Sequence, residues 1–257
     1  AIRLNPGIGA GHHKKVVTAG DDTKFGINIE DLGQVKSLLA KYDLKLVGIN
    51  QHIGSLFLDS KPYIEGAKSL LRAAKNFDNL EFIDFGGGFG IPYRKQTGEK
   101  PLDLGMPGEK LTSLMYSGTE EYGKEILFKA EPGRYIVAES GVLLGSVYSI
   151  KQNNNITYIG TDIGFNVIMR PVLYDAYHDI EVYRDGNLVP SGSHDREVTI
   201  VGNICESGDI ISHGQKLPKI EIGDIIGIMD AGAYGYSMAS NYNNRLRPAE
   251  VLIDSNG

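Results

Sequence analysis

The stretch Phe82-Ile83-Asp84-Phe85-Gly86-Gly87-Gly88-Phe89-Gly90 decides the fold of this 257-residue chain. Its first four residues are mostly apolar and predict a buried strand, which the glycine run then ends. Triple glycine directly after a strand lets the backbone approach a ligand closely, and its N–H groups suit a phosphate. The same run is also typical of a tight turn, so by itself it does not establish a binding site.

Strands and helices alternate on both sides of this run. Amphipathic helices are predicted for residues 32–42 and 63–77, where apolar side chains recur at spacings of three and four. A strand is predicted for residues 46–49, and residues 122–128 fit either a helix end or a strand. This order predicts parallel βα units, in a barrel or a doubly wound sheet. Residues 94–117, rich in glycine, proline and charge, are interpreted as a surface excursion.

The pattern changes after about residue 137. Short β-like runs follow without intervening helices, at residues 142–150, 156–161, 180–184, 198–204, 224–229 and 249–253. Turn-forming residues such as Asn153-Asn154-Asn155 separate several of them. We therefore expect an α/β plus β architecture, in which a βα barrel portion precedes an antiparallel β-sandwich or β-barrel domain.

The composition narrows the functional class. Hydrophobic residues make up 41% of the chain and charged residues 23%, which is ordinary for a globular protein. The formal net charge of −6, with no prominent basic block, argues against a nucleic-acid partner. No apolar run is long enough to span a membrane, and a single cysteine predicts a reducing, cytoplasmic location.

Candidate binding or catalytic residues follow three successive predicted strands. His52 follows the first, Gly86, Gly87 and Gly88 follow the second, and Glu131-Pro132-Gly133-Arg134 follows the third. In parallel βα folds these loops converge on one face. Taken singly, His52 is more typical of a packed histidine, and Glu131 with Arg134 of a structural ion pair. Together they offer a flat ring, a phosphate cradle and a carboxylate, which predicts a flat phosphorylated heterocycle such as pyridoxal phosphate.

Cys205 is the only cysteine of the sequence, and it lies in Cys205-Glu206-Ser207-Gly208-Asp209 after an apolar run. It has no second cysteine for a disulfide or a thiolate metal site, and we predict no metal site. A thiol loses its proton near neutral pH, so Cys205 is a candidate proton donor or acceptor. The alternative interpretation is a small buried side chain, because free cysteine is usually buried.

At this point the chain resembles the diaminopimelate decarboxylase family, within the alanine-racemase-like, fold type III group of pyridoxal-phosphate enzymes. The resemblance covers nearly the whole chain. It is carried by six motifs in the family's order: His52-Ile53-Gly54-Ser55, Gly86-Gly87-Gly88-Phe89-Gly90, Glu131-Pro132-Gly133-Arg134, Arg170-Pro171-Val172-Leu173-Tyr174, Cys205-Glu206-Ser207-Gly208-Asp209 and Gly232-Ala233-Tyr234-Gly235-Tyr236-Ser237. It implies that residues 1–137 form the C-terminal portion of a TIM-like (β/α)8 barrel that binds pyridoxal phosphate. Residues 138–257 are expected to form the C-terminal β domain, whose last strands are candidates for a return to the barrel domain.

The resemblance also implies roles for individual residues. His52 stacks on the cofactor ring, Glu131 faces its nitrogen, and the phosphate region is lined by Ser55, Gly86, Gly87, Gly88, Gly133, Arg134 and Tyr234. Arg134, Arg170 and Tyr174 contact the distal carboxylate of the substrate, and Glu206 contacts its distal ammonium group. Tyr234 is a further substrate-binding residue. Cys205 and His52 are the catalytic residues, and Cys205 helps to return a proton to the α-carbon. Cys205 and Glu206 enter the neighbouring subunit's active site, which implies a homodimer.

One family feature is missing from the sequence. The cofactor-bearing lysine of the family lies in a run like Tyr-Ala-Xaa-Lys-Ala, and no such run occurs here. We therefore expect the chain to be a segment of a longer enzyme, inactive alone, with unpaired strand edges where the barrel is incomplete.

The expected activity is decarboxylation of meso-diaminopimelate to L-lysine and CO2, the last step of lysine biosynthesis. Alternatives within the fold are decarboxylases of D-lysine, ornithine or carboxynorspermidine. A non-enzymatic pyridoxal-phosphate-binding protein with the same barrel is a second class, and the β strands after residue 137 argue against it because such proteins lack the β domain. A pseudoenzyme or non-catalytic fragment is a third class, which the missing lysine leaves open.

Overall fold

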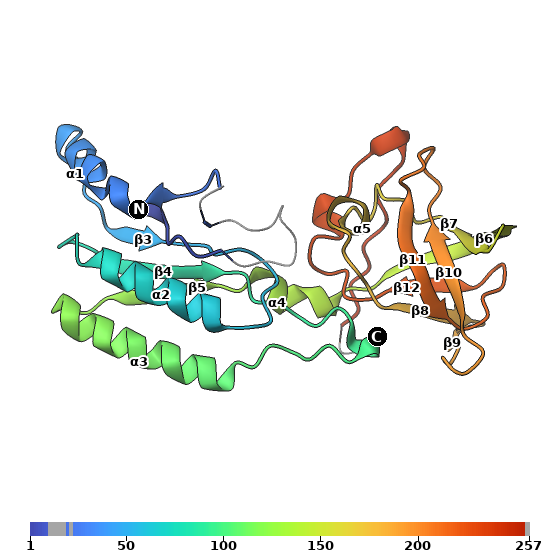
Figure 1. Ribbon diagram of the computed structural model, residues 1–257. Helices are drawn as coiled ribbons and strands as arrows, with labels where there is room; N and C mark the ends of the chain where they lie inside the picture. The colour runs from blue at the N-terminus through green and yellow to red at the C-terminus, as the bar shows by residue number, and fades with distance from the viewer. Residues whose placement is uncertain (10–18, 21–22, 255–257) are drawn as a thin grey trace. The chain divides into compact units, whose positions relative to one another are not determined.

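The computed structural model describes residues 1–9, 19–20 and 23–254, and the chain divides into two compact units (Figure 1). Unit 1 comprises Ala1–Pro92 and Lys100–Ile136, and unit 2 comprises Tyr93–Glu99 and Val137–Gly257. Each unit has a hydrophobic core of its own. The α/β plus β class expected from the sequence is confirmed.

Unit 1 is a parallel sheet with helices between its strands. The five strands lie in the order β2-β1-β3-β4-β5, and every pair of neighbours is parallel. Their bounds are β1 Ile2–Asn5, β2 Ile27–Asn28, β3 Gly48–Asn50, β4 Phe82–Gly87 and β5 Leu127–Glu131. The helices are α1 Leu32–Lys41, α2 Lys61–Ala74, α3 Gly105–Tyr122 and the short α4 Gly133–Val137.

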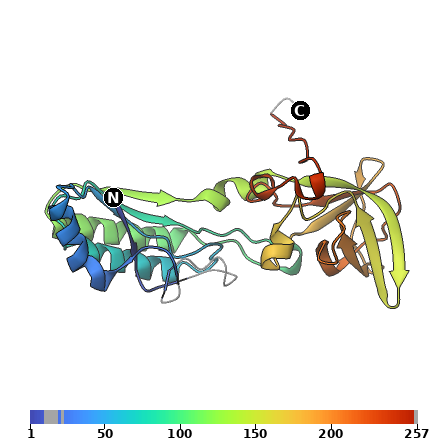
Figure 2. The same ribbon diagram turned by 90° about the horizontal axis from the view of Figure 1, so that it is seen from above.

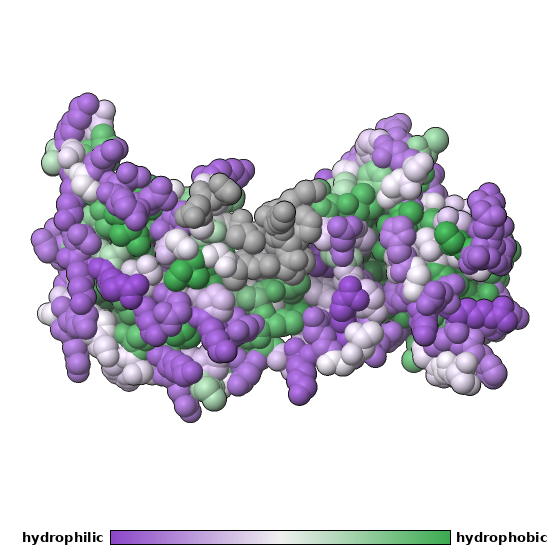
Figure 3. Space-filling view, in the orientation of Figure 1, coloured by the Kyte–Doolittle hydropathy of each residue, from purple (hydrophilic) through white to green (hydrophobic). Residues whose placement is uncertain are grey.

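Helix α2 forms because its apolar residues recur on one face. Its buried residues include Tyr63, Ala67 and Leu70, which belong to one core cluster with Ile49 and Ile83 of the sheet. Helices α2 and α3 lie side by side along the sheet (Figure 1), and the exposed face over them is mostly hydrophilic in Figure 3. Because β3, β4 and β5 are parallel neighbours, their carboxyl ends lie at one edge of the sheet.

Helix α3 corrects the prediction for residues 94–117. We expected a surface excursion, but residues 105–122 are helical. Pro107 lies near the start of the helix, where a missing N–H is tolerated, and Leu111 and Met115 pack against the core. Gly118 provides the room for Leu71 of α2, because a Cβ at this position would come within 2.8 Å of the leucine Cδ2.

Unit 2 is a seven-stranded sheet with the order β11-β10-β7-β6-β12-β8-β9. Its strands are β6 Leu143–Asn153, β7 Ile156–Thr161, β8 Ile180–Arg184, β9 Asn187–Leu188, β10 Arg196–Val201, β11 Ile210–Leu217 and β12 Ile225–Ile228. Its one α-helix in the described residues is α5, Arg170–Tyr174. Strands β6 and β7 form a long hairpin, seen from above in Figure 2.

The sheet of unit 2 is mixed, and this corrects the expectation of a purely antiparallel domain. Strand β10 pairs with β7 in parallel, whereas the other neighbouring pairs are antiparallel. The long connection from β7 through α5, β8 and β9 brings β10 back in the same direction, which no hairpin can do. Hairpin signals in the sequence do not reveal such a connection.

The strand predicted for residues 249–253 is wrong. These residues carry no strand in the structure, and Val251, Leu252 and Ile253 are largely exposed. An apolar run becomes a strand only where another strand offers its backbone groups. The expected return of the last strands to the barrel domain stays a prediction.

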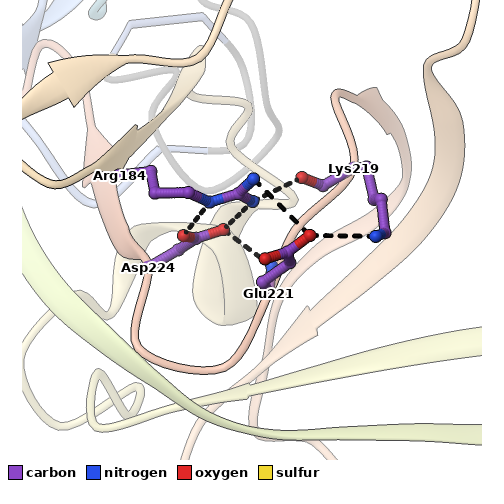
Figure 4. A network of polar contacts seen from close by, with 4 residues as sticks. All are labelled: Arg184, Lys219, Glu221 and Asp224. Carbon is purple, nitrogen blue, oxygen red and sulfur yellow. Dashed lines mark hydrogen bonds and ion pairs between the residues drawn. The ribbon is translucent and has the colours of Figure 1, made fainter.

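A polar network joins the end of β8 to the turn before β12 (Figure 4). Arg184 donates from Nε and Nη2 to the two carboxylate oxygens of Asp224, each at 2.8 Å. Asp224 also accepts from the backbone N–H of Glu221 at 2.6 Å, and Lys219 pairs with the Glu221 carboxylate at 2.9 Å. In the described part of the chain, no helix is both long and apolar enough to cross a membrane.

Candidate active site

His52 and the glycine run lie beside each other at the carboxyl ends of β3 and β4. The backbone N–H of Gly87 donates to Nδ1 of His52 at 3.2 Å, and Arg3 donates to the His52 carbonyl oxygen at 3.3 Å. Because Nδ1 accepts a hydrogen bond, the imidazole is neutral with its proton on Nε2. Two of the three predicted strand ends are thus in direct contact.

The three glycines are required by the packing of the backbone itself. A Cβ on Gly86 would come within 2.1 Å of the Gln51 oxygen, and one on Gly88 within 2.1 Å of the Gly54 oxygen. A Cβ on Gly87 would come within 2.0 Å of the carbonyl oxygen of Glu131 on β5. The glycine run therefore lets three strand ends approach one another, whether or not a ligand is present.

The segment after β5 contacts the loop after β3. Arg134 is 6% exposed and donates from Nη2 to the Ser55 hydroxyl at 3.1 Å. Gly133 has no atom within 4 Å of the place that a Cβ would occupy, so the space beside it is open. We call His52, Ser55, Gly86–Gly88, Glu131, Gly133 and Arg134 the strand-end cluster.

Electrostatics in this cluster depend on two residues that the sequence analysis did not single out. Burial, and then Arg3, lower the pKa of His52, while Asp84 opposes this. Burial, and then Asp84, raise the pKa of Glu131, while Arg3 opposes that change. Asp84 also accepts from the Gly86 N–H at 2.8 Å. A charged residue inside an apolar strand is the signal that identifies Asp84 from the sequence.

An aromatic cluster supports the two loops that follow β3 and β4. The rings of Phe57, Tyr63 and Phe89 have centroids 4.8–5.4 Å apart. The Tyr63 hydroxyl donates to the Gly86 carbonyl oxygen at 3.2 Å, and burial raises the pKa of this tyrosine well above its usual value. The loops that carry the cluster are thus held by packing beneath them.

The remaining predicted residues belong to unit 2. Arg170 begins α5 and is almost fully buried, with Nη1 donating to Nε2 of His178 at 2.6 Å and its guanidinium 4.3 Å from the Tyr93 ring centroid. His178 donates from Nδ1 to the Met229 carbonyl oxygen at 2.7 Å. Tyr174 lies at the other end of the same helix. Arg170 is thus oriented by a histidine that the sequence analysis missed.

Cys205 and Glu206 lie in an exposed turn after β10. Strand β10 ends at Val201, so Cys205 belongs to the loop and not to the strand end, and its thiol is exposed. The alternative of a small buried side chain is therefore wrong. The Tyr242 hydroxyl donates to a carboxylate oxygen of Glu206.

Tyr234 occupies a strained backbone position. Its φ is +61°, a left-handed conformation that disfavours a residue with a side chain, and its ring is partly exposed. Asp230, four residues earlier, has a φ of +56°. Asn154 and Asp185, in turns outside the predicted site, have a similar φ, so the backbone conformation does not distinguish this turn and the role of Tyr234 stays a prediction.

The chain thus combines a parallel βα unit, whose polar residues lie at the strand ends, with a β unit that presents an exposed Cys-Glu turn. Residues 39–232 match the family model described as pyridoxal-dependent decarboxylase, C-terminal sheet domain. The chain belongs to this family.

The chain is similar to proteins named diaminopimelate decarboxylase. The one from Methanothermobacter thermautotrophicus is 40% identical over 98% of this chain and 59% of its own length, and the one from Escherichia coli K12 is 35% identical over 99% and 62%. A crystal structure of diaminopimelate decarboxylase matches with a TM-score of 0.91 and 34% identity, over 100% of this chain and 62% of that chain. The Helicobacter pylori enzyme complexed with L-lysine has a TM-score of 0.81 and 34% identity, over 94% and 58%. The resemblance stated from the motifs is confirmed, and the chain spans about three fifths of the length of these relatives.

Proposed function

We propose that this chain supplies cofactor-binding and substrate-binding residues of a pyridoxal-phosphate-dependent decarboxylase. The reaction is the conversion of meso-diaminopimelate to L-lysine and CO2, the last step of lysine biosynthesis. The observation that carries the proposal is the strand-end cluster, in which His52 and Gly87 share a hydrogen bond. The names of the relatives support the substrate, and L-lysine in the Helicobacter pylori structure is the product of the proposed reaction.

The residues of the strand-end cluster fit pyridoxal phosphate. They provide a neutral imidazole, a serine hydroxyl, a buried guanidinium and an open space at Gly133, which suit a planar ring that carries a phosphate. In the proposal His52 lies against the ring, and Ser55, Gly86–Gly88, Gly133 and Arg134 surround the phosphate. When bound, the cofactor accepts the electrons released as CO2 leaves.

Glu131 would keep the nitrogen of a bound cofactor ring protonated. Burial raises the pKa of the Glu131 carboxyl, and a positively charged ring nitrogen beside it would offset that rise. The sheet that holds these residues is proposed to be the C-terminal portion of a (β/α)8 barrel.

Unit 2 contributes the residues proposed to recognise the substrate. Arg170 and Tyr174 would bind the distal carboxylate, because a guanidinium makes paired charge-assisted hydrogen bonds to it. Glu206 would bind the distal ammonium group. Cys205, with its exposed thiol, would hold the proton that is returned to the α-carbon. We propose that the Cys-Glu turn serves the site of a second copy in a homodimer, and that the enzyme is cytoplasmic.

The test is a substrate panel with the complete protein and added pyridoxal phosphate. Evolved CO2 and amine products are measured with meso-diaminopimelate, ornithine, D-lysine and carboxynorspermidine. We expect CO2 and L-lysine from meso-diaminopimelate in equal amounts. Faster CO2 release from ornithine would reject the substrate, and bound cofactor without CO2 from any compound would indicate a non-catalytic binding protein.

A further inference from the structure

The loop that carries Cys205 and Glu206 ends at a buried carboxylate. We call residues 202–209 the thiol loop. Residues 205–208 are exposed, so no apolar core holds them, but Asp209 is only 4% exposed. A buried charge is costly unless hydrogen bonds compensate for its lost hydration. Asp209 therefore needs an explanation that the loop's exposure does not provide.

The Asp209 carboxylate accepts two short hydrogen bonds from backbone N–H groups. Oδ1 accepts from Phe165 at 2.7 Å, and Oδ2 accepts from Ile204 at 2.7 Å. The Asp209 carbonyl oxygen accepts from the Gly202 N–H at 3.0 Å, and the Asp209 N–H donates to the Glu206 carbonyl oxygen at 3.1 Å. Burial raises the pKa of the Asp209 carboxyl, and the two backbone donors oppose that rise.

Each of these bonds fixes a different part of the loop. The Phe165 bond ties it to the segment after β7, the Ile204 bond fixes the residue directly before the thiol, and the Glu206 bond closes the turn. The Asp209 side chain makes the first two of these bonds, so it ties the thiol loop to the segment after β7 and fixes the residue before the thiol. The Glu206 bond is made by the Asp209 backbone.

Gly202 leaves the space that this carboxylate occupies, and Gly164 leaves space for Ile204 of the thiol loop. A Cβ on Gly202 would come within 2.3 Å of Oδ2 of Asp209 and within 2.6 Å of the Gly164 Cα. A Cβ on Gly164 would come within 2.6 Å of a side-chain carbon of Ile204. The close approach of the two backbones is therefore independent evidence that Asp209 is built into the loop.

We propose that Asp209 is a positioning residue, whose buried carboxylate holds the thiol loop in the conformation that presents Cys205 and Glu206 together. The roles of Cys205 and Glu206 in the reaction rest on the proposed function, but the conformation of the loop does not. In this proposal Asp209 acts through Cys205 and Glu206 and not through a contact with substrate.

The first test replaces Asp209 by Asn in the complete protein. Asn keeps one acceptor oxygen but turns an NH2 group toward a backbone N–H, so one of the two anchoring bonds is lost. Labelling of Cys205 by iodoacetamide, quantified on its peptide by mass spectrometry, reports the loop without any need for activity. We expect faster labelling, and a loss in kcat/KM for meso-diaminopimelate of about tenfold or more, since ångström displacements of reacting groups are costly. Asp185→Asn, the same change at an exposed turn of unit 2, is expected to alter neither.

A second variant disturbs the same contact and keeps the carboxylate. Gly202→Ala places a methyl group where Oδ2 lies and should reproduce both effects, whereas Gly192→Ala, with no atom within 4 Å of the new Cβ, should not. This variant keeps the proposal testable if Asp209→Asn does not fold.

A double-mutant cycle with Glu206→Gln separates positioning from general destabilisation. If Asp209 acts through the loop, Asp209→Asn adds less to the kcat/KM loss in the Glu206→Gln background than in the wild type. Fully additive losses, or Cys205 labelling in both Asp209→Asn and Gly202→Ala that equals the controls, would overturn the proposal. If labelling changes but Cys205→Ala and Glu206→Gln leave turnover intact, the positioning role stands and the proposed function of these two residues fails.

Discussion

Replacing Gly87 by Ala tests whether the glycine run is needed for the close approach of the strand ends. A Cβ at Gly87 would lie 2.0 Å from the carbonyl oxygen of Glu131, and real Cβ contacts are essentially never under 3.0 Å. The ends of β4 and β5 must therefore separate by about 1 Å. The segment that begins at Glu131 moves with β5, and the hydrogen bond from Gly87 to His52 lengthens.

The cost has two parts. Forcing an extra carbon into a packed backbone contact costs about 1–3 kcal/mol, and the lost Gly87–His52 hydrogen bond adds about 1 kcal/mol. Because a displacement of about 1 Å can reduce turnover on the order of 100-fold, activity should fall more than stability.

The assays are urea unfolding, pyridoxal phosphate titration and turnover of the complete protein. Gly108→Ala in α3 is the control, since its Cβ meets no atom within 4 Å and Ala favours the helix by up to about 1 kcal/mol. If Gly87→Ala unfolds at the wild-type urea concentration and binds the cofactor with unchanged Kd, the close approach of the strand ends does not need the glycine.

Three further predictions concern stability. Burial lowers the pKa of His52 in the folded protein. The contribution of the neutral His52 to the free energy of unfolding is therefore complete above the ordinary histidine pKa of about 6.5. It declines as the pH falls from there toward the lowered pKa of the folded state. Urea midpoints between about pH 5 and 7 should therefore fall more steeply in the wild type than in His52→Gln, and equal slopes would contradict this. The hydrogen bond from Arg184 lowers the pKa of Asp224, so this stabilisation is present above the usual Asp value and is lost as the pH falls through the folded pKa. Acid unfolding of Asp224→Asn should be less steep in that range, and an unchanged acid limb would argue against the pair. Ile226→Ala, at a fully buried core position, should cost about 2–5 kcal/mol in thermal or urea unfolding. Ile222→Ala, at a 67% exposed position, should stay within about 0.5 kcal/mol, and similar losses for both would contradict the assigned core.

Local patterns in the sequence were sufficient where the structure depends on periodicity. The spacing of apolar residues placed α1 at Leu32–Lys41 and α2 at Lys61–Ala74 close to the predicted ranges, and the apolar runs placed β7 and β8. These elements follow from the sequence because the buried face of a helix or strand repeats within a few residues. The order of motifs was likewise enough to indicate the family.

The same local patterns failed where a partner distant in sequence decides the outcome. Residues 249–253 have the composition of a strand but no strand beside them, and residues 105–117 have loop-like composition but a core to pack against. The parallel pairing of β10 with β7 also depends on a long connection that has no local signature.

The candidate site shows the same division. The sequence by itself determined which residues follow the strands, and so which residue types are available: His52, the glycine run and the Cys-Glu turn. Only the tertiary structure decided that Gly87 donates to His52, that His178 orients Arg170, and that Asp209 anchors the thiol loop. Hydrogen bonds and close backbone contacts join residues that are far apart in the chain, and their geometry is set when the strands pair and the loops pack.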